Sequence, residues 1–296
     1  MTKSKSKGTA LLWVTISYIL AAGAAIGVGF LFREEPQWLY LLLADLAATL
    51  VIFAFGVAFK NSSFYDPYWS VIPIWACAFL LLYPESESVN LLRAGMATAV
   101  VTVWGVRLTW NWWRGWAGLH HEDWRYVNLR HKTGLWFQFV NFTGIMLMPT
   151  VLVFLGMLPL LLAMSQSDAP LNVLDGLGLA IGLAGVVLEG TADNQLRRFR
   201  LGNPPREAIL ETGLWKYSRH PNYFGEITFW YGVFCFGLAC GWEYYWTGAG
   251  ALGMTALFLF ISIPMIDKRM LARRPGYAER MKRVSKVVPW LPKKQA

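Results

Sequence analysis

The sequence predicts an all-α fold, a polytopic integral membrane helical bundle of about seven or eight transmembrane helices. Three observations support this prediction. Of the 296 residues, 55% are hydrophobic and only 15% are charged, whereas soluble domains carry about 25% charged residues. Eight apolar runs approach the length of about 20 residues that crosses a bilayer as a helix. Lys and Arg are concentrated in alternate connections between these runs, which is typical of membrane topology.

The eight apolar runs define the expected spans. The third and seventh are short for a helix that crosses a bilayer. The fifth is long and contains Pro149 and Pro159, which can kink or split a helix. The expected spans are Ala10–Phe32, Trp38–Phe59, Trp69–Tyr83, Val89–Trp110, Leu135–Met164, Leu171–Glu189, Glu226–Gly241 and Tyr245–Ile266.

The distribution of basic residues predicts the orientation of the chain. With a cytoplasmic N-terminus, 25 of the 27 Lys and Arg residues lie in cytoplasmic segments, and only Arg33 and Arg93 lie outside. Both termini are then cytoplasmic, and the bacterial inner membrane is the expected location. The first apolar run is longer than the h-region of a signal peptide, about 7–15 residues, so we expect a retained helix.

Three cytoplasmic segments are longer than simple connections require, and they carry most of the polar side chains. They are Asn111–Gly134, Gly190–Phe224 and Asp267–Ala296. A protein that only packed helices together would not need them. We therefore expect these segments to form the walls of a site at the cytoplasmic face of the membrane.

Composition and spacing argue against several other classes of protein. The net charge is +9, but the basic residues do not form a stripe on a soluble face, so no nucleic-acid partner is expected. Four histidines and three cysteines without metal-type spacing argue against a metal site. A GxGxxG match at 248–253 lies inside an apolar run and favours close helix packing. Membrane lipids are expected partners, and no obligate protein partner is evident.

Two polar motifs follow the fourth and sixth spans. Glu122–Tyr126 combines two acids, an Arg and two aromatic residues. It suits either an interfacial belt or a loop that binds a nucleotide. On a continuing helix, Asp193, Arg197 and Arg200 share one face. Snorkelling explains these arginines, but an acid such as Glu189 at the end of an apolar helix is expensive and indicates a site.

The most informative motif is Thr212–Ile227. Pro221 can begin a helix that enters the membrane, because its missing N–H has no partner in the first turn. Asn222 and Glu226 then lie one turn apart on the same face. The helix N-terminus, together with Lys216, Arg219 and His220, favours a bound phosphate, and Glu226 favours a hydrogen bond to an amide or ribose.

These motifs resemble the membrane steroid 5α-reductase family (3-oxo-5-alpha-steroid 4-dehydrogenase-like), in a bacterial branch. The similarity is good over the last half of the chain and includes Asn222–Glu226, Trp230, Arg273–Tyr277 and Val288–Trp290. It implies a reductase that transfers hydride from NADPH to an activated C=C bond (an enone) of an apolar, steroid-like lipid. The cofactor-binding residues that the resemblance implies are Arg114, Arg125, Tyr126, Asp193, Arg197, Arg200, Tyr217, Asn222, Tyr223 and Glu226.

The resemblance does not extend to the catalytic pair, a Glu and a Tyr in earlier helices of the family. A loose alignment places Trp104 near the Tyr position and Asp66, beside Tyr65 and Tyr68, near the Glu position. We therefore take Asp66 and Tyr68 as candidate catalytic residues that polarise the substrate carbonyl. Asp66 can equally cap a helix that enters the membrane. Residues 1–110 are then the expected substrate part of a single membrane domain, and 111–296 the cofactor part.

Two other functions remain open at this point. Isoprenylcysteine and phospholipid methyltransferases also use an Arg-His-Pro-x-Tyr-x-Gly run, which Arg219–Gly225 matches. They bind S-adenosylmethionine, which has no phosphate, so the arginines of Asp193–Arg200 would be surplus. A lipid-binding or scaffold protein would leave the three polar cytoplasmic segments without a purpose. The site chemistry therefore favours an NADPH-dependent reductase.

Overall fold

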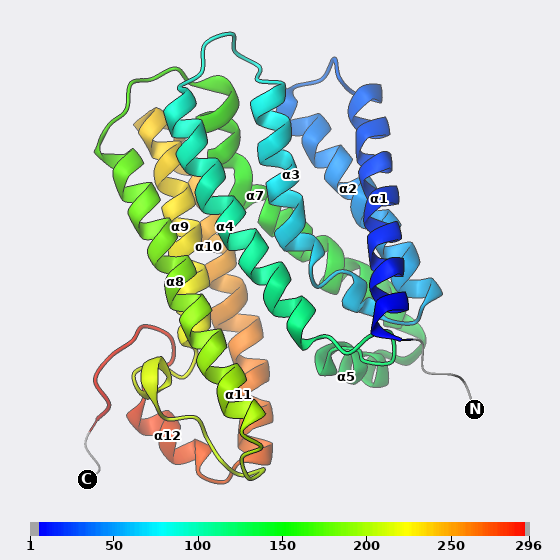
Figure 1. The fold of residues 1–296 in the computed structure, drawn as a ribbon, viewed down its shortest axis with the longest axis vertical. Helices are drawn as coiled ribbons and strands as arrows, with labels where there is room; N and C mark the ends of the chain where they lie inside the picture. The colour runs from blue at the N-terminus through cyan, green and yellow to red at the C-terminus, as the bar shows by residue number, and fades with distance from the viewer. Residues whose placement is uncertain (1–5, 294–296) are drawn as a thin grey trace.

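The computed structural model describes residues 6–293, which fold into a bundle of long helices (Figure 1). Eight helical stretches are long and apolar enough to cross a membrane. Within the described residues there is no β-strand, and Ser218 and Ser285 form an isolated bridge. The prediction of an all-α, polytopic membrane bundle is confirmed.

The described chain crosses the bundle eight times, so that its first and last helices both lie with their outer ends at the same end of the molecule (Figure 1). The α-helices are α1 (Lys7–Leu31), α2 (Gln37–Ala58), α3 (Tyr68–Leu82), α4 (Leu91–Gly115), α5 (Trp124–Thr133), α6 (Phe137–Val140), α7 (Met148–Leu161), α8 (Val173–Leu201), α9 (Pro221–Cys240), α10 (Ala249–Ala256), α11 (Ile263–Arg273) and α12 (Tyr277–Arg283). Short 3-10 segments are η1 (Ser62–Phe64), η2 (Gly134–Trp136), η5 (Gly213–Lys216) and η6 (Trp242–Gly248), and π-helical segments are η3 (Asn141–Leu147), η4 (Leu162–Gln166) and η7 (Leu257–Ser262).

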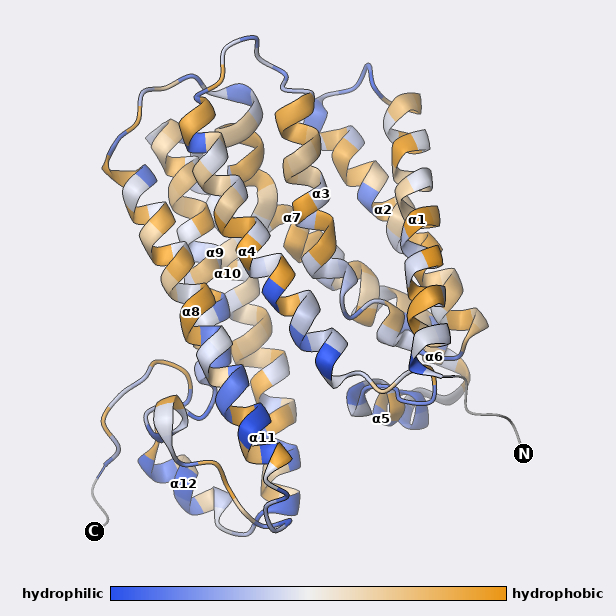
Figure 2. Ribbon diagram, in the orientation of Figure 1, coloured by the Kyte–Doolittle hydropathy of each residue, from blue (hydrophilic) through white to orange (hydrophobic). Residues whose placement is uncertain are grey.

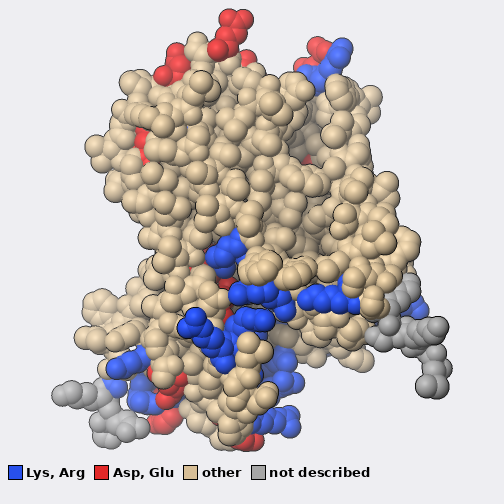
Figure 3. Space-filling view, viewed as in Figure 1, with Lys and Arg blue, Asp and Glu red and all other residues tan. Residues whose placement is uncertain are grey.

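Hydropathy and charge divide the molecule along its long axis. The upper two-thirds of the helices are mostly apolar, and hydrophilic residues are concentrated at the lower end, around α5, α11 and α12 (Figure 2). Lys and Arg gather in the lower half of the face shown in Figure 3, whereas acidic side chains dominate the top. We call these the arginine-rich end and the acidic end. The asymmetry agrees with the charge pattern that predicted the topology.

The long fifth span is not interrupted by its prolines. Helical structure continues from Phe137 to Gln166, and its hydrogen bonding changes to π-helical before Pro149 and again after Pro159. Pro149 lies in the first turn of α7, where the missing N–H of a proline removes no hydrogen bond within that helix. The π-helical turns change the local pattern of backbone hydrogen bonds. This change lets the helix continue through both prolines.

Helices α8 and α9 approach so closely that glycines are required between them. A Cβ atom added to Gly185 would lie 2.5 Å from the backbone nitrogen of Phe229, and one on Gly225 would lie 2.6 Å from that of Glu189. Small residues let helix backbones touch in a membrane. This contact places Glu189 of α8 directly beside the first turns of α9.

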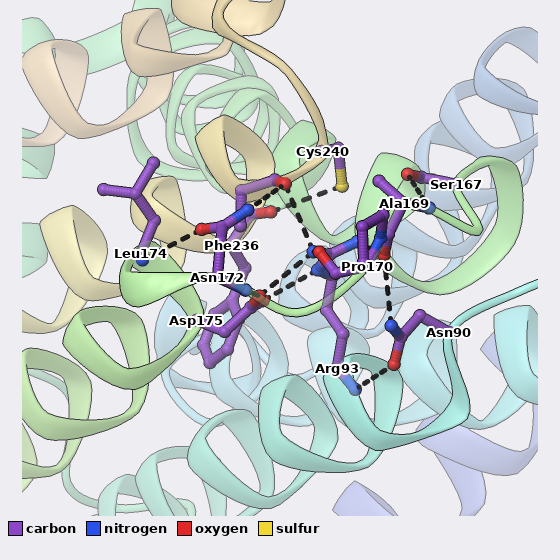
Figure 4. A network of polar contacts seen from close by, with 11 residues as sticks. Asn90, Arg93, Ser167, Ala169, Pro170, Asn172, Leu174, Asp175, Phe236 and Cys240 are labelled. Atoms are coloured by element: carbon purple, nitrogen blue, oxygen red, sulfur yellow. Dashed lines mark hydrogen bonds and ion pairs between the residues drawn. The ribbon is translucent and has the colours of Figure 1, made fainter.

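A buried ion pair fixes the acidic end of the bundle (Figure 4). The Arg93 guanidinium donates to Asp175 over 2.7 and 3.0 Å, and both side chains are almost fully buried. Its remaining N–H groups donate to the carbonyls of Ala169, Pro170 and Ala239. Asp175 also accepts from the backbone N–H of Asn172 in a capping box that begins α8. One arginine thus joins α4, α8 and the end of α9.

We expect Arg93→Met to reduce the free energy of unfolding by about 3–5 kcal/mol, because it leaves a buried carboxylate without a partner. Arg33→Met is the matched control, since Arg33 is exposed and its ion pair with Glu34 contributes about 0–1 kcal/mol. Unfolding of the purified proteins in one detergent measures both. Equal stability of the two variants would contradict this account of the Arg93 network.

Candidate functional site

Polar side chains from α4, α8 and α9 form a column that runs from the arginine-rich end into the bundle. Arg107 of α4 contacts Glu189 over 2.5 Å and Asp193 over 3.1 Å. Asn111, one turn further along α4, also donates to Asp193. We call Arg107, Asn111, Glu189, Asp193 and Glu226 the polar column. Three of its members are acids and one is a base, so the column is rich in hydrogen-bond acceptors.

Glu226 is the deepest member of the polar column, and two tryptophans hold it. The indole N–H of Trp104 donates to Oε2 and that of Trp230 donates to Oε1, each over 2.9 Å. Glu226 is 2% exposed and lies beside Glu189. The sequence predicted that Glu226 accepts a hydrogen bond from an amide or a ribose. In the structure both of its carboxylate oxygens accept from indole N–H groups of the protein. Asn222, one turn before it, lies beside Asp193.

A second polar group lies at the mouth of the bundle around α5. The Tyr126 hydroxyl donates to Asp66 over 2.6 Å, and the Arg125 guanidinium pairs with Asp123 over 2.8 Å. The Arg269 guanidinium of α11 lies 3.9 Å from the ring of Trp124, within range of a cation–π contact. α5 therefore bridges α11 and the segment around Asp66 that precedes α3.

Several arginines at this end form no ion pair among residues 6–293. Arg200 lies near Asp193 and Arg274, and Arg269 lies near Arg273, Asp123 and Arg200. Burial and the neighbouring Arg273 lower the pKa of Arg274, as expected where like charges are crowded. The Nη1 atom of Arg269 is buried without a hydrogen-bond partner. Crowded, unpaired guanidinium groups suit an anion such as phosphate.

A separate network of hydroxyl groups lies in the N-terminal half. The Tyr68 hydroxyl donates to Asp45 Oδ1 over 2.6 Å, and both side chains are buried. Thr49 lies beside Tyr68 and is 3.0 Å from Thr150, which in turn is 2.8 Å from the Tyr65 hydroxyl. The two predicted catalytic residues therefore have different hydrogen-bond partners, Asp45 for Tyr68 and Tyr126 for Asp66.

Asp45 opens onto an apolar cavity of about 730 Å³ between α1, α2, α3 and α7. Ligand pockets commonly enclose about 300–1,000 Å³ and combine an apolar lining with a few polar groups. Asp45 is the acid in this lining and Arg33 is the base, and the other lining residues are apolar apart from Tyr40 and Tyr83. Figure 1 shows the positions of α1, α2, α3 and α7, which supply the lining residues. The geometry thus offers one carboxyl group to an apolar ligand.

Asp267 gathers three donors at the start of α9. It accepts from Arg219 over 2.7 Å, from the Tyr277 hydroxyl over 2.6 Å, and is 2.9 Å from His220 Nε2. Burial lowers the pKa of His220, and the contact with Asp267 opposes this only in part. Burial and the bond to Asp267 raise the pKa of Tyr277. The Arg219 and His220 side chains, predicted to favour a phosphate, are instead engaged by this carboxylate.

The remaining predicted cofactor residues lie around the polar column or away from it. Arg114 donates to Asn111 and Asn194, at the outer end of the column. Tyr223 lies near Arg125. Arg197 is partly exposed and has no ion pair within residues 6–293. Tyr217 lies in the C-terminal region, where its carbonyl accepts from the backbone N–H of Trp290.

The sequence interpretation missed three residues of these groups. Asp45 is a lone acid within an apolar run, and this signal alone marks an expensive position. Arg107 was assigned only to the positive charge of the cytoplasmic side, although Arg107, Asn111 and Arg114 recur on one helix face. For Arg269, no local pattern shows that α11 brings it against Trp124.

We expect acid to weaken the folded state through His220. Its pKa in the folded state is below the unfolded value of 6.5. The unfolded chain therefore binds the proton more readily, and stability that is complete above pH 6.5 is lost as the pH falls through that value. Thermal unfolding between about pH 8 and 5 should show a decline that His220→Gln reduces. His131→Gln, at an exposed position of α5, should keep the decline, and equal curves for both variants would contradict the assignment.

Comparison with known proteins places the chain in a family without fixing its activity. The family model described as "Protein of unknown function (DUF1295)" matches residues 52–284, which contain the polar column and the α5 group but not Asp45. The "Uncharacterized protein C594.04c" of Schizosaccharomyces pombe is 25% identical, and the alignment covers 92% of this chain and 85% of that protein. No solved structure matches the chain. Because the family model covers most of the sequence, the protein belongs to the DUF1295 family.

Proposed function

We propose that this protein is an NADPH-dependent membrane reductase that reduces an activated C=C bond in an apolar, steroid-like lipid. The observation that carries the proposal is the pairing of two unlike sites in one bundle. Crowded, unpaired arginines and the polar column lie at one end, and an apolar cavity with a single carboxyl group lies toward the other. An enzyme that joins a polyanionic cofactor to a lipid needs both.

The arginine-rich end supports the cofactor half of the proposal. Arg200, Arg269 and Arg274 would hold phosphate groups, because they lie close together and form no ion pair within residues 6–293. Buried atoms without a hydrogen-bond partner, Nη1 of Arg269 and Nε of Arg114, fit the same kind of anion. Trp124 presents an aromatic face nearby. S-adenosylmethionine carries no phosphate and would leave these arginines without a ligand.

The Asp45–Tyr68 pair supports the substrate half. Tyr68 occupies Oδ1 of Asp45, so Oδ2 is the carboxyl oxygen that remains for a ligand in the cavity. A protonated Asp45 would donate to the carbonyl oxygen of an enone and stabilise the charge that develops there. The Tyr68 bond holds the carboxyl group in place. We therefore assign the polarising role to Asp45 with Tyr68, in place of Asp66, whose carboxylate is bonded to Tyr126 outside the cavity lining.

The proposed reaction is a conjugate reduction. NADPH, when bound, would supply the hydride that adds to the β-carbon of the enone. Asp45 would donate a hydrogen bond to the carbonyl oxygen while the C=C π electrons move toward it, and the enolate would then take a proton from water at the α-carbon. The apolar walls exclude water, which strengthens the hydrogen bond to the oxygen. The arginine-rich end faces the cytoplasm of a bacterial inner membrane in this proposal, because the cofactor is available there.

Nucleotide binding tests the cofactor assignment. Purified protein should bind NADPH and not S-adenosylmethionine, and Asn222→Ala should weaken NADPH binding because Asn222 lies beside Asp193. We expect a loss of about tenfold, or 1.4 kcal/mol, measured by calorimetry. Asn203→Ala, in the exposed loop after α8, is the matched control. Binding of S-adenosylmethionine without NADPH would instead support the methyltransferase alternative.

A pair of carboxyl substitutions tests the catalytic assignment. Asp45→Asn should lower kcat for reduction of an enone lipid by about 10²-fold or more, since it removes the proton that polarises the carbonyl. The Kd for NADPH should stay unchanged, because Asp45 lies in the apolar cavity. Asp66→Asn serves as the comparison. A loss of kcat in Asp66→Asn that exceeds the loss in Asp45→Asn would overturn the choice of Asp45.

A further inference from the structure

The segment after α12, residues 284–293, returns to the part of the bundle that spans the membrane. In Figure 1 it rises toward the apolar region of the helices before it turns down again. Lys286 Nζ donates to the Leu259 carbonyl over 3.2 Å, and Leu259 lies inside the span Trp242–Arg273. Val287 is buried in the main apolar core of the bundle. The segment therefore lies at the edge of the bilayer, not in the water beyond it.

Three apolar side chains of this segment are exposed. Val288, Trp290 and Leu291 are 56%, 73% and 75% exposed, and we call them the apolar patch. Phe260, next to Leu259, is 77% exposed and belongs to a membrane span. Exposed apolar side chains cost free energy in water, and Trp is enriched where a membrane meets water. The apolar patch thus extends the lipid-facing surface of the bundle.

Basic side chains accompany the apolar patch. From Arg280 to Lys293 the sequence contains five Lys or Arg residues and no acid. Lys286 and Lys293 are exposed, and neither forms an ion pair within the described part of the chain. An ammonium group has three N–H donors, so Lys286 keeps donors for a ligand beside its bond to the Leu259 carbonyl. A tryptophan flanked by unpaired lysines is a combination that binds an anionic bilayer surface.

Hydrogen bonds hold the segment in this position. The N–H of Trp290 donates to the Tyr217 carbonyl over 3.0 Å, and the Ser218 hydroxyl donates to the Val287 carbonyl over 2.6 Å. An apolar surface that is held in one conformation loses little entropy when it binds. Both bonds connect the segment to residues that directly precede α9.

We propose that the apolar patch inserts into the leaflet at the arginine-rich end, and that Lys286 and Lys293 bind the phosphate groups of anionic lipids there. A soluble protein partner would also cover an apolar patch, but it would have to displace the lipid that adjoins Phe260. The inference is separate from the proposed reaction, since no residue of the segment belongs to the polar column or to the cavity lining.

A spin label measures the depth of the apolar patch. The full chain carries Leu291→Cys for the label, Cys235 and Cys240 are changed to Ala, and the buried Cys77 is kept. The protein is placed in nanodiscs of phosphatidylcholine alone or of an equal mixture with phosphatidylglycerol. In the mixture, the ratio of oxygen to nickel-chelate collisions should be about threefold or more above that of Leu201→Cys. Leu201 is the matched control, because it is 65% exposed and ends α8 at the arginine-rich end.

A pair of charge substitutions tests the lipid preference. Lys286→Gln with Lys293→Gln should lower the ratio in the mixed nanodiscs to its value in phosphatidylcholine alone, because the attraction to anionic head groups is lost. Lys132→Gln with Lys268→Gln removes the same charge from exposed positions of α5 and α11 and should leave the ratio unchanged.

Three results would overturn the proposal. Free access of the nickel chelate to Leu291→Cys in both lipids would place the apolar patch in water. Low access to both oxygen and nickel would indicate that protein covers the patch, such as a second copy of the chain. An equal ratio in the two lipids would remove the role of anionic head groups. Trp290→Cys repeats the measurement if Leu291→Cys does not fold, and the assay needs neither nucleotide nor substrate.

Discussion

The bilayer offers no water to a polar group inside the bundle, and this constraint governs where charge can lie in the molecule. A charged or hydrogen-bonding side chain in a span must find its partner within the protein. Arg93 does so with Asp175 and three carbonyls, and Glu226 does so with two indoles. Each arrangement joins helices that are distant in sequence. Polar groups that are rare in such a chain therefore determine how its apolar helices assemble.

The two ends of the bundle differ in how many of their charged side chains have hydrogen-bond or ion-pair partners. At the acidic end each side-chain nitrogen of Arg93 has at least one hydrogen-bond acceptor, which suits a structural role (Figure 4). At the arginine-rich end, Arg200, Arg269 and Arg274 lie near one another and form no ion pair among residues 6–293, although Asp193 and Asp123 lie near two of them. Mutual repulsion of these cations opposes folding, and the anion of the proposal would relieve it. Unsatisfied charge is therefore stronger support for a ligand than the number of charges.

The fold was predictable because its signals are local and strong. Apolar length and the positions of Lys and Arg indicated the eight spans, and Pro221 marked the first residue of α9. Pairing across helices was not predictable in the same way. Nothing in the sequence near Tyr68 indicates that its hydroxyl meets Asp45 on α2 rather than Asp66, two residues before it. Glu226 was identified as a polar centre, but its indole partners depend on how α4 and α9 face each other.

The two sites of the proposal are separated by aromatic rings. Trp69, the residue after Tyr68, packs edge-on against Trp104, with ring centroids 5.9 Å apart, and the Trp104 indole N–H is bonded to Glu226. Trp104 is fully buried and stacks on Phe229. Hydride transfer requires reacting atoms about 3–3.5 Å apart. A nicotinamide ring at the polar column must therefore pass or replace Trp104 to reach a carbonyl at Asp45.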